Sequence, residues 1–289
     1  MTMKKQETQW LFEISSEKKL FHINLKELYN YRDLLSLFVR RDIVAVYKQT
    51  VLGPLWFLIQ PIFTSLIQFI VFFKIANIPS DGVPYFLFVL AGNTIWSYFS
   101  ISLNDTAQTF KDNQDIFGKV YFPRAIMPIA ITLSNLFKFS IQLALFVAVL
   151  IYISFTGGHV SPNLLILLTP CIIVVMALIS MGLGMVITSL TTKYRDFTHL
   201  LAFGMSLFMY LTPVVYPTSL ALDKAPEGYK WLVYVNPLTG LLDLFKYAYL
   251  GEGVLNWWAI SWSCIFAILI YIAGLVIFNR TEKSFMDTI

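Results

Sequence analysis

The segment from residue 55 to residue 73 is an apolar run without a charged side chain, and it ends only at Lys74. A helix of about 20 such residues crosses the roughly 30 Å hydrocarbon core of a bilayer. Inside that core every backbone N–H and C=O must be bonded within the protein, so spanning structures are helices or closed barrels. Because the run is too long for a barrel strand, it predicts a transmembrane helix.

The whole chain has the composition of a membrane protein. Of its 289 residues, 57% are hydrophobic and 13% are charged, whereas about a quarter are charged in a soluble domain. Apolar runs predict six crossings, at about 55–76, 84–103, 127–153, 164–190, 198–216 and 257–278. The predicted fold class is therefore an all-α integral membrane protein, with residues 51–289 as a single six-helix transmembrane domain.

The residues before the first run predict an amphipathic helix over 31–50, because apolar and charged side chains recur there at helical spacing. The apolar side chains are Leu34, Leu35, Phe38, Ile43, Val46 and Tyr47, and the charged ones are Arg32, Arg40, Arg41, Asp42 and Lys48. A cation-rich helix of this kind suits the surface of an anionic membrane leaflet. Residues 1–30 are polar and mixed in charge, which indicates a cytoplasmic extension.

The distribution of positive charge predicts that both termini are cytoplasmic. Most of the 21 lysines and arginines fall in residues 1–50 and in the connections and tail that six crossings place on the same side. Cytoplasmic segments of membrane proteins carry such an excess of Lys and Arg. The outer segments are left with Lys224, Lys230 and Lys246, and Lys74 lies near an outer end.

Residues 238–250 form a semi-apolar helical pattern that is too short to cross the membrane. One interpretation is a short re-entrant, periplasmic helix that dips into the outer face between crossings five and six, sheltered by protein or a water-filled cavity. The other is a helix that lies on the outer interface with its aromatic rings at headgroup depth. The sequence favours neither.

Polar and aromatic side chains inside three predicted crossings are candidates for lining a path for a polar substrate. Gln60, Thr64 and Gln68 recur every four residues and therefore share one helix face. The other candidates are Asn93, Trp96, Ser97 and Tyr98 in crossing two, and Tyr210, Thr212 and Tyr216 at the end of crossing five. The alternative is hydrogen bonding between helices and an aromatic belt at the interface.

Crossing three carries a second polar stripe, Ser134, Lys138 and Gln142, for which hydrogen bonding between helices is the favoured interpretation. A charge at the depth of Lys138 costs at least about 2.5 kcal/mol when it faces lipid, so we expect it to face a partner, to face a cavity or to snorkel outward. In crossing four, Ser180 and Gly184 form a small-xxx-small pattern that is typical of close helix packing.

The charged connection between crossings two and three predicts a short helix from Ala107 to Phe117. Its apolar residues are too sparse to predict burial. A charged cytoplasmic helix between two crossings would offer a docking point for a soluble partner; the alternative is a plain solvated loop.

The sequence offers no catalytic centre and no metal site. It contains no phosphate-binding glycine loop, no His-Glu-x-x-His motif and no Gly-x-Ser-x-Gly motif. The three histidines are far apart in sequence, and Cys171 and Cys264 lack metal-ligand spacing and are interpreted as small apolar residues. We therefore expect no catalytic residue, no metal ligand and no cofactor in this chain.

Several motifs, spread along most of the chain, resemble the permease subunit of polysaccharide-exporting ABC transporters, which handle O-antigen, capsule and teichoic acid in bacteria. They are Arg41-Asp42-Ile43, Tyr47–Trp56 with Gly53-Pro54, Phe122-Pro123-Arg124 with Pro128, Tyr194-Arg195-Asp196, Leu211–Pro217, Asn236-Pro237-Leu238 and Leu250-Gly251. The resemblance implies a multi-pass protein of the bacterial cytoplasmic membrane that moves a lipid-linked polysaccharide and contacts membrane lipids but no nucleic acid.

The resemblance also implies partners. Two copies of the chain would pair around a channel, and two copies of a separate ATPase subunit would bind ATP and Mg²⁺. The helix at 31–50 would be the interface helix, Gln108–Phe117 the coupling helix, and 238–250 part of a periplasmic gate. The residues expected to couple to the ATPase are Arg40, Arg41, Asp42, Gln108, Lys111, Asp112, Asp115 and Arg124.

Two alternatives stay open at this point. An exporter of a small lipid or a drug in the same superfamily would have the same architecture. A membrane-embedded glycan acyltransferase would need clustered histidines or acidic residues at a membrane surface, and the scattered histidines disfavour it.

Overall fold

The computed structural model describes residues 29–48, 53–120, 122–194 and 196–285, and every regular element in these ranges is a helix. Residues 1–28 of the extension predicted over 1–30 lie outside the described residues, as do residues 49–50 of the amphipathic helix predicted over 31–50. The helix in that region, α2, covers Arg32–Lys48.

Five helical segments are long and apolar enough to span a membrane: Trp56–Ile75, Tyr85–Ala107, Ile126–Phe155, Leu164–Thr191 and Trp257–Thr281. The elements that contain them are α3 (Trp56–Gln68) with η2 (Phe69–Ile75), α4 (Tyr85–Ala107), α7 (Ile126–Phe155), η3 (Leu164–Leu168) with α8 (Thr169–Thr191), and α13 (Trp257–Phe285). The chain is accordingly a multi-pass helical membrane protein.

The helix in the region of the predicted fifth crossing is shorter than the sequence indicates. This helix, α9 (Phe197–Leu211), ends five residues before the predicted end at residue 216 and is not among the five spanning segments. The reason is Pro213, whose ring disfavours the helical conformation at the preceding residue; Thr212 is extended, with φ −101° and ψ 139°. Residues 212–217 therefore leave the helix and expose their carbonyls to other partners.

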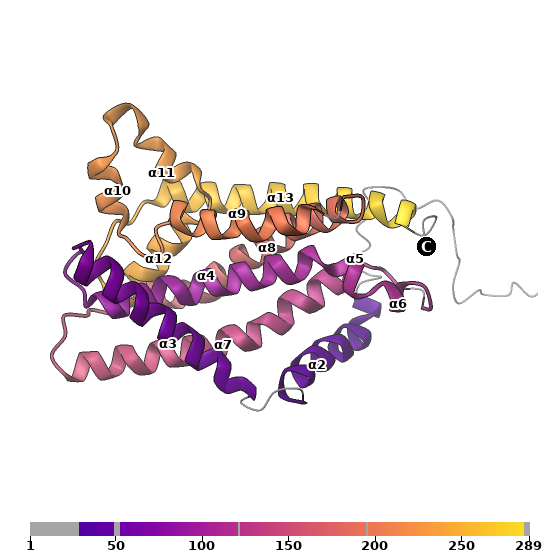
Figure 1. Cartoon of the computed structure of the whole chain (residues 1–289), viewed down its shortest axis with the longest axis horizontal. Helices are drawn as coiled ribbons and strands as arrows, with labels where there is room; N and C mark the ends of the chain where they lie inside the picture. Colours follow the sequence, from indigo (N-terminus) through magenta and orange to yellow (C-terminus); the bar gives the residue numbers. More distant parts are fainter. Residues whose placement is uncertain (1–28, 49–52, 121, 195, 286–289) are drawn as a thin grey trace, which may run out of the picture.

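The short helices gather at the two ends of the bundle (Figure 1). At one end, called the α5/α6 end, lie α5 (Thr109–Asp112) and α6 (Gln114–Phe117), near the end of α13. At the opposite end, called the α10–α12 end, lie α10 (Thr218–Lys224), η4 (Glu227–Tyr229), α11 (Trp231–Val235) and α12 (Thr239–Leu250).

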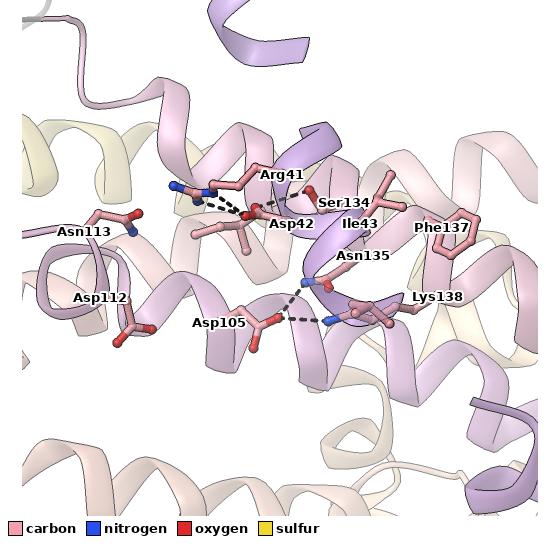
Figure 2. A pocket seen from close by; sticks show the side chains of 12 residues that line it. Arg41, Asp42, Ile43, Asp105, Asp112, Asn113, Ser134, Asn135, Phe137 and Lys138 are labelled. Atoms are coloured by element: carbon pink, nitrogen blue, oxygen red, sulfur yellow. Dashed lines mark hydrogen bonds and ion pairs between the residues drawn. The ribbon is translucent and has the colours of Figure 1, made fainter. Parts of the chain in front are cut away.

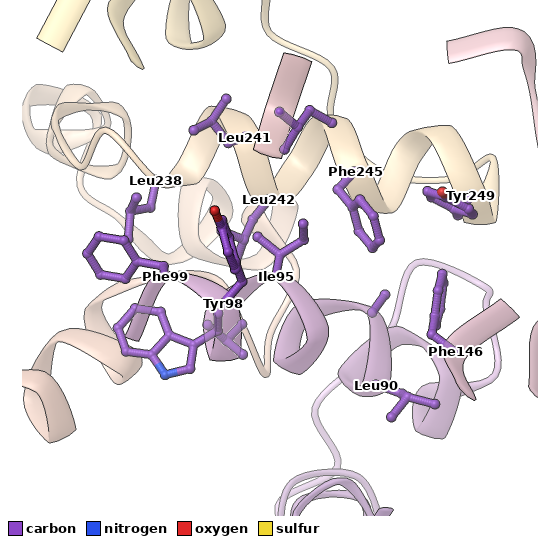
Figure 3. Close-up of a cluster of buried hydrophobic side chains, with 14 of the residues drawn as sticks. Leu90, Ile95, Tyr98, Phe99, Phe146, Leu238, Leu241, Leu242, Phe245 and Tyr249 are labelled. Atoms are coloured by element: carbon purple, nitrogen blue, oxygen red, sulfur yellow. The ribbon is translucent and has the colours of Figure 1, made fainter. Parts of the chain in front are cut away.

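The second spanning helix, α4, is the centre of the fold. In its most apolar stretch 78% of the residues are buried, against 17–33% in the other spanning segments. It packs against α3, α7, α8, α9 and α12. Side chains of α4 such as Tyr98 and Ile95 meet α12 in the larger core cluster, where Phe245 lies 5.7 Å from the ring of Phe146 on α7 (Figure 3).

Helix α12 carries a lysine that is buried, and the burial of its aromatic rings bears on the two interpretations of this segment. Lys246 was counted among the charges of an outer segment, but its side chain is only 4% exposed. The ring of Phe245 is fully buried and that of Tyr249 nearly so. These aromatics therefore pack inside the protein, which argues against a helix lying flat at headgroup depth.

Close packing of α8 against α13 depends on two glycines. A Cβ added at Gly274 would collide with the carbonyl oxygen of Gly182, and one added at Gly182 would lie 2.7 Å from the carbonyl oxygen of Ile270. A Cβ added at Gly184, also on α8, would meet the side chain of Thr106 on α4 at 2.5 Å. The small-residue pattern in crossing four is confirmed as a packing feature, because small residues let helix backbones approach closely.

We predict that Gly274→Ala lowers the free energy of unfolding by about 1–3 kcal/mol, the usual cost of forcing extra atoms into a packed contact. Gly204→Ala on α9 is the matched control, because its Cβ would meet nothing within 4 Å. That control should be neutral or stabilise by up to about 1 kcal/mol. Denaturant titration of both variants in detergent checks the difference, and equal effects would contradict the packing argument.

Candidate functional site

A cavity with a polar lining lies where α2, the end of α4, α5 and α7 meet, and we call this region the α2–α7 junction (Figure 2). Its volume is about 280 Å³. The lining residues are Arg41, Asp42, Ile43 and Val46 from α2, Asp105 from α4, Asp112 and its neighbour Asn113, and Ile131, Ser134, Asn135, Phe137 and Lys138 from α7. Three of the residues expected to couple to a partner ATPase, Arg41, Asp42 and Asp112, are thus neighbours.

Two carboxylates connect the elements of the junction. Asp42 is 2.8 Å from an Arg41 nitrogen, and the Ser134 hydroxyl donates to its other oxygen at 3.4 Å, which joins α2 to α7. Asp105 accepts from the Asn135 amide at 3.1 Å and lies 3.5 Å from the Lys138 ammonium, which joins α4 to α7 (Figure 2). The expectation that Lys138 faces a partner is confirmed.

Helices α5 and α6 are anchored on the bundle rather than solvated. The Thr188 hydroxyl on α8 accepts from the backbone N–H of Phe110 at 3.3 Å, and the Phe110 ring stacks on Phe278 of α13 at 4.6 Å. Phe110 and Phe117 are buried. The expectation that apolar residues here are too sparse for burial is therefore wrong, because two phenylalanines suffice when neighbouring helix ends supply the rest of a small core.

Exposure divides the predicted coupling residues. Arg40, Arg41, Lys111, Asp112 and Asp115 are exposed, Asp42 and Gln108 are half-buried, and Arg124 is buried. Partial burial raises the pKa of the Asp112 carboxyl; Lys111 opposes this rise and Asp105 adds to it. The Arg124 guanidinium lies 5.0 Å above the centroid of the Phe117 ring, so it contributes to packing at this end whatever its role in coupling.

The residues that are candidates for lining a substrate path also differ in their exposure. Gln60 and Thr64 are exposed on α3 and Tyr210 is exposed on α9, while Gln68, Ser97 and Tyr216 are half-buried. Asn93, Trp96, Tyr98 and Thr212 are buried within the chain. The Asn93 amide donates to Ser65 at 2.8 Å and to Gln68 at 2.7 Å, which ties α4 to α3. In one copy of the chain these buried groups bond and pack between helices.

Sequence reasoning missed the two buried charges of α12. On α12 the Lys246 ammonium donates to the carbonyls of Pro213 and Val214 at 2.6 and 3.0 Å, and one oxygen of Asp243 accepts from the Thr218 hydroxyl at 2.7 Å. The spacing of Asp243 and Lys246, three residues apart in a predicted helix that is otherwise apolar, was the available signal. Asp105 and Asn135 were missed because their pairing is visible only once α4 and α7 lie together.

Comparison with known proteins gives a consistent result. The model of a family described as "ABC-2 type transporter" matches residues 33–250. The O-antigen export system permease protein RfbA of Klebsiella pneumoniae is 28% identical over 269 residues, which cover 92% of this chain and 99% of that protein. A protein of the same name from Myxococcus xanthus is 25% identical over 92% of this chain and 98% of its own length.

A further relative carries a different polymer in its name. The polysialic acid transport protein KpsM of Escherichia coli is 20% identical over 260 residues, which cover 88% of this chain and 95% of that protein. These relatives are matched over nearly their full lengths, so the likeness extends from α2 to α13 and is not confined to one motif.

We predict that Asp105 and Lys138 stabilise the fold as a pair. A double-mutant cycle with Asp105→Asn and Lys138→Met should give a coupling energy of about 0.5–1 kcal/mol, because both side chains are partly exposed and screened. Arg32 and Asp33, 3.9 Å apart and far more exposed, are the control pair and should show no measurable coupling. Unfolding titrations of the four proteins in each cycle measure this, and zero coupling for Asp105 and Lys138 would contradict the assignment.

Proposed function

Because the chain belongs to the ABC-2 type transporter family, we propose that it is the membrane subunit of an ATP-driven exporter of a lipid-linked polysaccharide in the bacterial cytoplasmic membrane. The relatives named for O-antigen export and polysialic acid transport support this substrate class. A separate ATPase would supply ATP and Mg²⁺, and the permease by itself catalyses no reaction.

The α2–α7 junction is the observation that carries the proposal. Four elements line its cavity, and of these α4 and α7 are joined by the ion pair of Asp105 and Lys138. Three residues that face the cavity, Arg41, Asp42 and Asp112, come from the two segments expected to meet the ATPase. A soluble partner that pushes on α5 and α6 would act on α8 and α13 through Phe110. It would also act on α4, which directly precedes α5 in the chain, and Asp105 near the end of α4 contacts Lys138 of α7. Packed helices transmit such displacements because they are close-packed and move as units.

Under this proposal α2 is an interface helix that acts as a lever on the first crossing. Asp42 of α2 accepts a hydrogen bond from Ser134 of α7. The short turn η1 (Gly53–Leu55) comes after α2 in the chain and leads into α3. Gly53 has a φ of 49°, a left-handed conformation that glycine adopts at no steric cost. Under this proposal, Gly53 is the hinge between α2 and α3.

We further propose six crossings with the α5/α6 end in the cytoplasm and the α10–α12 end outside. Helix α9 and the non-helical residues 212–217 together would form the fifth crossing. The excess of Lys and Arg in the segments at the α5/α6 end supports this orientation.

The channel would form between two copies of the chain, lined by the exposed polar face of α3. Gln60 and Thr64 are exposed there, and Tyr210 is an exposed aromatic on α9. Amide and hydroxyl groups can bond the hydroxyls of a sugar, while aromatic faces can stack on its ring.

Deletion of the gene tests the function directly. We expect loss of one surface polysaccharide with accumulation of its lipid-linked form inside the cell, and restoration by the intact chain. Purified chain with its co-expressed ATPase should move that polymer across liposome membranes only when ATP is supplied. A normal cell surface, or movement of small lipids alone, would contradict the proposal.

We predict that Asp112→Lys uncouples hydrolysis from export. Reversing this exposed charge on α5 should lower the rate of export at least tenfold, which corresponds to a rise of about 1.4 kcal/mol in the activation free energy of export. ATP hydrolysis by the assembled complex should persist. The measurement is the ratio of polymer exported to ATP hydrolysed in proteoliposomes.

Asp223→Lys is the matched control, since Asp223 is equally exposed but lies on α10 at the opposite end. It should leave the ratio unchanged. Equal ratios in the Asp112 variant and the control would remove Asp112 from the coupling surface.

We predict that Gln60→Trp slows export because a large ring would narrow the proposed channel. Leu66→Trp places the same ring on the same helix, about 240° away around its axis, at a residue that is 42% exposed. Export rates at equal amounts of membrane-inserted protein give the comparison. If both variants export normally, the polar face of α3 has a role in helix packing and does not line a channel.

A further inference from the structure

Lys246 on α12 is a buried cation that the proposed export mechanism does not use. Its ammonium donates to the carbonyl oxygens of Pro213 and Val214 and lies 3.7 Å from the centroid of the Phe88 ring on α4. A buried ammonium is costly unless hydrogen-bond acceptors or an aromatic face compensate for its lost water. Lys246 is therefore held at one place by one short segment and one helix.

That segment, residues 212–217, is fastened from several directions. The Asn236 amide donates to the Thr212 hydroxyl at 2.8 Å, and the Tyr85 hydroxyl of α4 donates to the carbonyl of Val215 at 2.5 Å. Just after the segment, the Thr218 hydroxyl donates to Asp243 of α12. Because Pro213 ends the helix, the carbonyls of residues 213–215 are available to accept the bonds from Lys246 and Tyr85.

The segment also lies directly on the backbone of α4. A Cβ added at Gly92 would be 2.5 Å from the carbonyl oxygen of Val214 and 3.2 Å from the Lys246 side chain. Thr212, Val214 and Val215 are buried. Residues 212–217, α4 and α12 thus form one closely packed unit at the α10–α12 end.

The rest of α9 is held differently. Met205 is its buried residue, and Leu200, Phe203 and Leu207 are exposed. Among the described residues, the side-chain hydrogen bond of the stretch 197–209 is that of Ser206 to Ala202 in the same helix. Near its outer end, the Phe208 ring packs on Trp96 and Phe99 of α4, at 5.8 and 6.1 Å between ring centroids. The other contacts of α9 with α4 and α8 are apolar and lack direction, so they permit sliding and tilting of the inner half.

We propose that Lys246 is a positioning residue that pins the outer end of α9 to α4 and α12, so that α9 swings about residues 213–214 during export. The inner half of the helix moves, and the outer end with α12 stays with α4. The assignment of this swing to export rests on the proposed function; the pin is a property of the chain alone.

Hydrogen exchange of the full chain in nanodiscs tests the pin without substrate or ATPase. In Lys246→Met the amides of Thr212, Val214, Val215 and Tyr216, the residues of the segment 212–217 that carry an N–H, should exchange at least about tenfold faster, the factor expected when a charge-assisted hydrogen bond is lost. Lys224→Met makes the same change at an exposed lysine of α10 and should leave hydrogen exchange of the amides in residues 212–217 unchanged.

A second control separates a pin from general stabilisation. Phe278→Ala removes a fully buried ring from the other core cluster and should destabilise the fold without raising exchange in residues 212–217. If Lys246→Met leaves exchange in this segment unchanged, or if Phe278→Ala raises it equally, the pin is overturned.

Two further variants serve if Lys246→Met does not fold. Loss of the cation leaves the buried Asp243 carboxylate uncompensated, so the double variant Asp243→Asn/Lys246→Met should fold better and still exchange faster in residues 212–217. Tyr85→Phe removes one bond to the same segment and keeps the ring. Unchanged exchange in both variants overturns the proposal.

Spin labels test the swing. Single cysteines at Leu200 and Leu211, both exposed, place a nitroxide at the inner and outer ends of α9 after Cys171 and Cys264 are replaced by alanine. When ATP is added to the complex with its ATPase, the spectrum of the inner label should change and that of the outer label should not. The opposite pattern, or equal changes at both positions, overturns the swing. Absence of ATP-dependent export with the expected exchange result would contradict the proposed function and leave the pin in place.

Discussion

The burial of α4 is the constraint on which the rest of the structure depends. A helix surrounded by other helices has little water to bond its polar side chains, so a partner on a neighbouring helix stabilises them strongly. Tyr85 bonds Val215 near the start of α4, Asn93 bonds Ser65 and Gln68 in its middle, and Asp105 bonds Asn135 and Lys138 near its end. One helix thereby fixes the segment after α9, then α3, then α7.

These three levels give the fold a division that suits a transporter. At the α5/α6 end, the partly exposed ion pair of Asp105 and Lys138 joins α4 to α7, and the hydrogen bond from Ser134 to Asp42 joins α7 to α2. Such partly exposed interactions are weak enough to rearrange. At the α10–α12 end, Lys246 and Asp243 are buried and would be costly to separate from their partners. The proposed export mechanism uses the first end as the place where a partner acts, and the further inference uses the second as the fixed point.

Sequence reasoning predicted the elements well because hydrophobic run length is a local property. Five of the six expected crossings are helices long and apolar enough to span, and their bounds differ from the expected ones by a few residues. It failed where a distant partner decides the outcome. Phe110 and Phe117 are buried because α13 supplies Phe278, and Lys246 is buried because residues 212–217 offer two carbonyls.

The candidate site divides in the same way. The amphipathic pattern of α2 and the charges of α5 and α6 can be read along the chain, but their meeting in one cavity cannot. From the sequence alone follow the helical class, the number of apolar runs, the side on which cations gather and the family motifs, because each depends on composition or spacing within one segment. Only the tertiary structure decided which polar groups are buried and which carboxylate pairs with which cation, because those choices depend on how close two helices come.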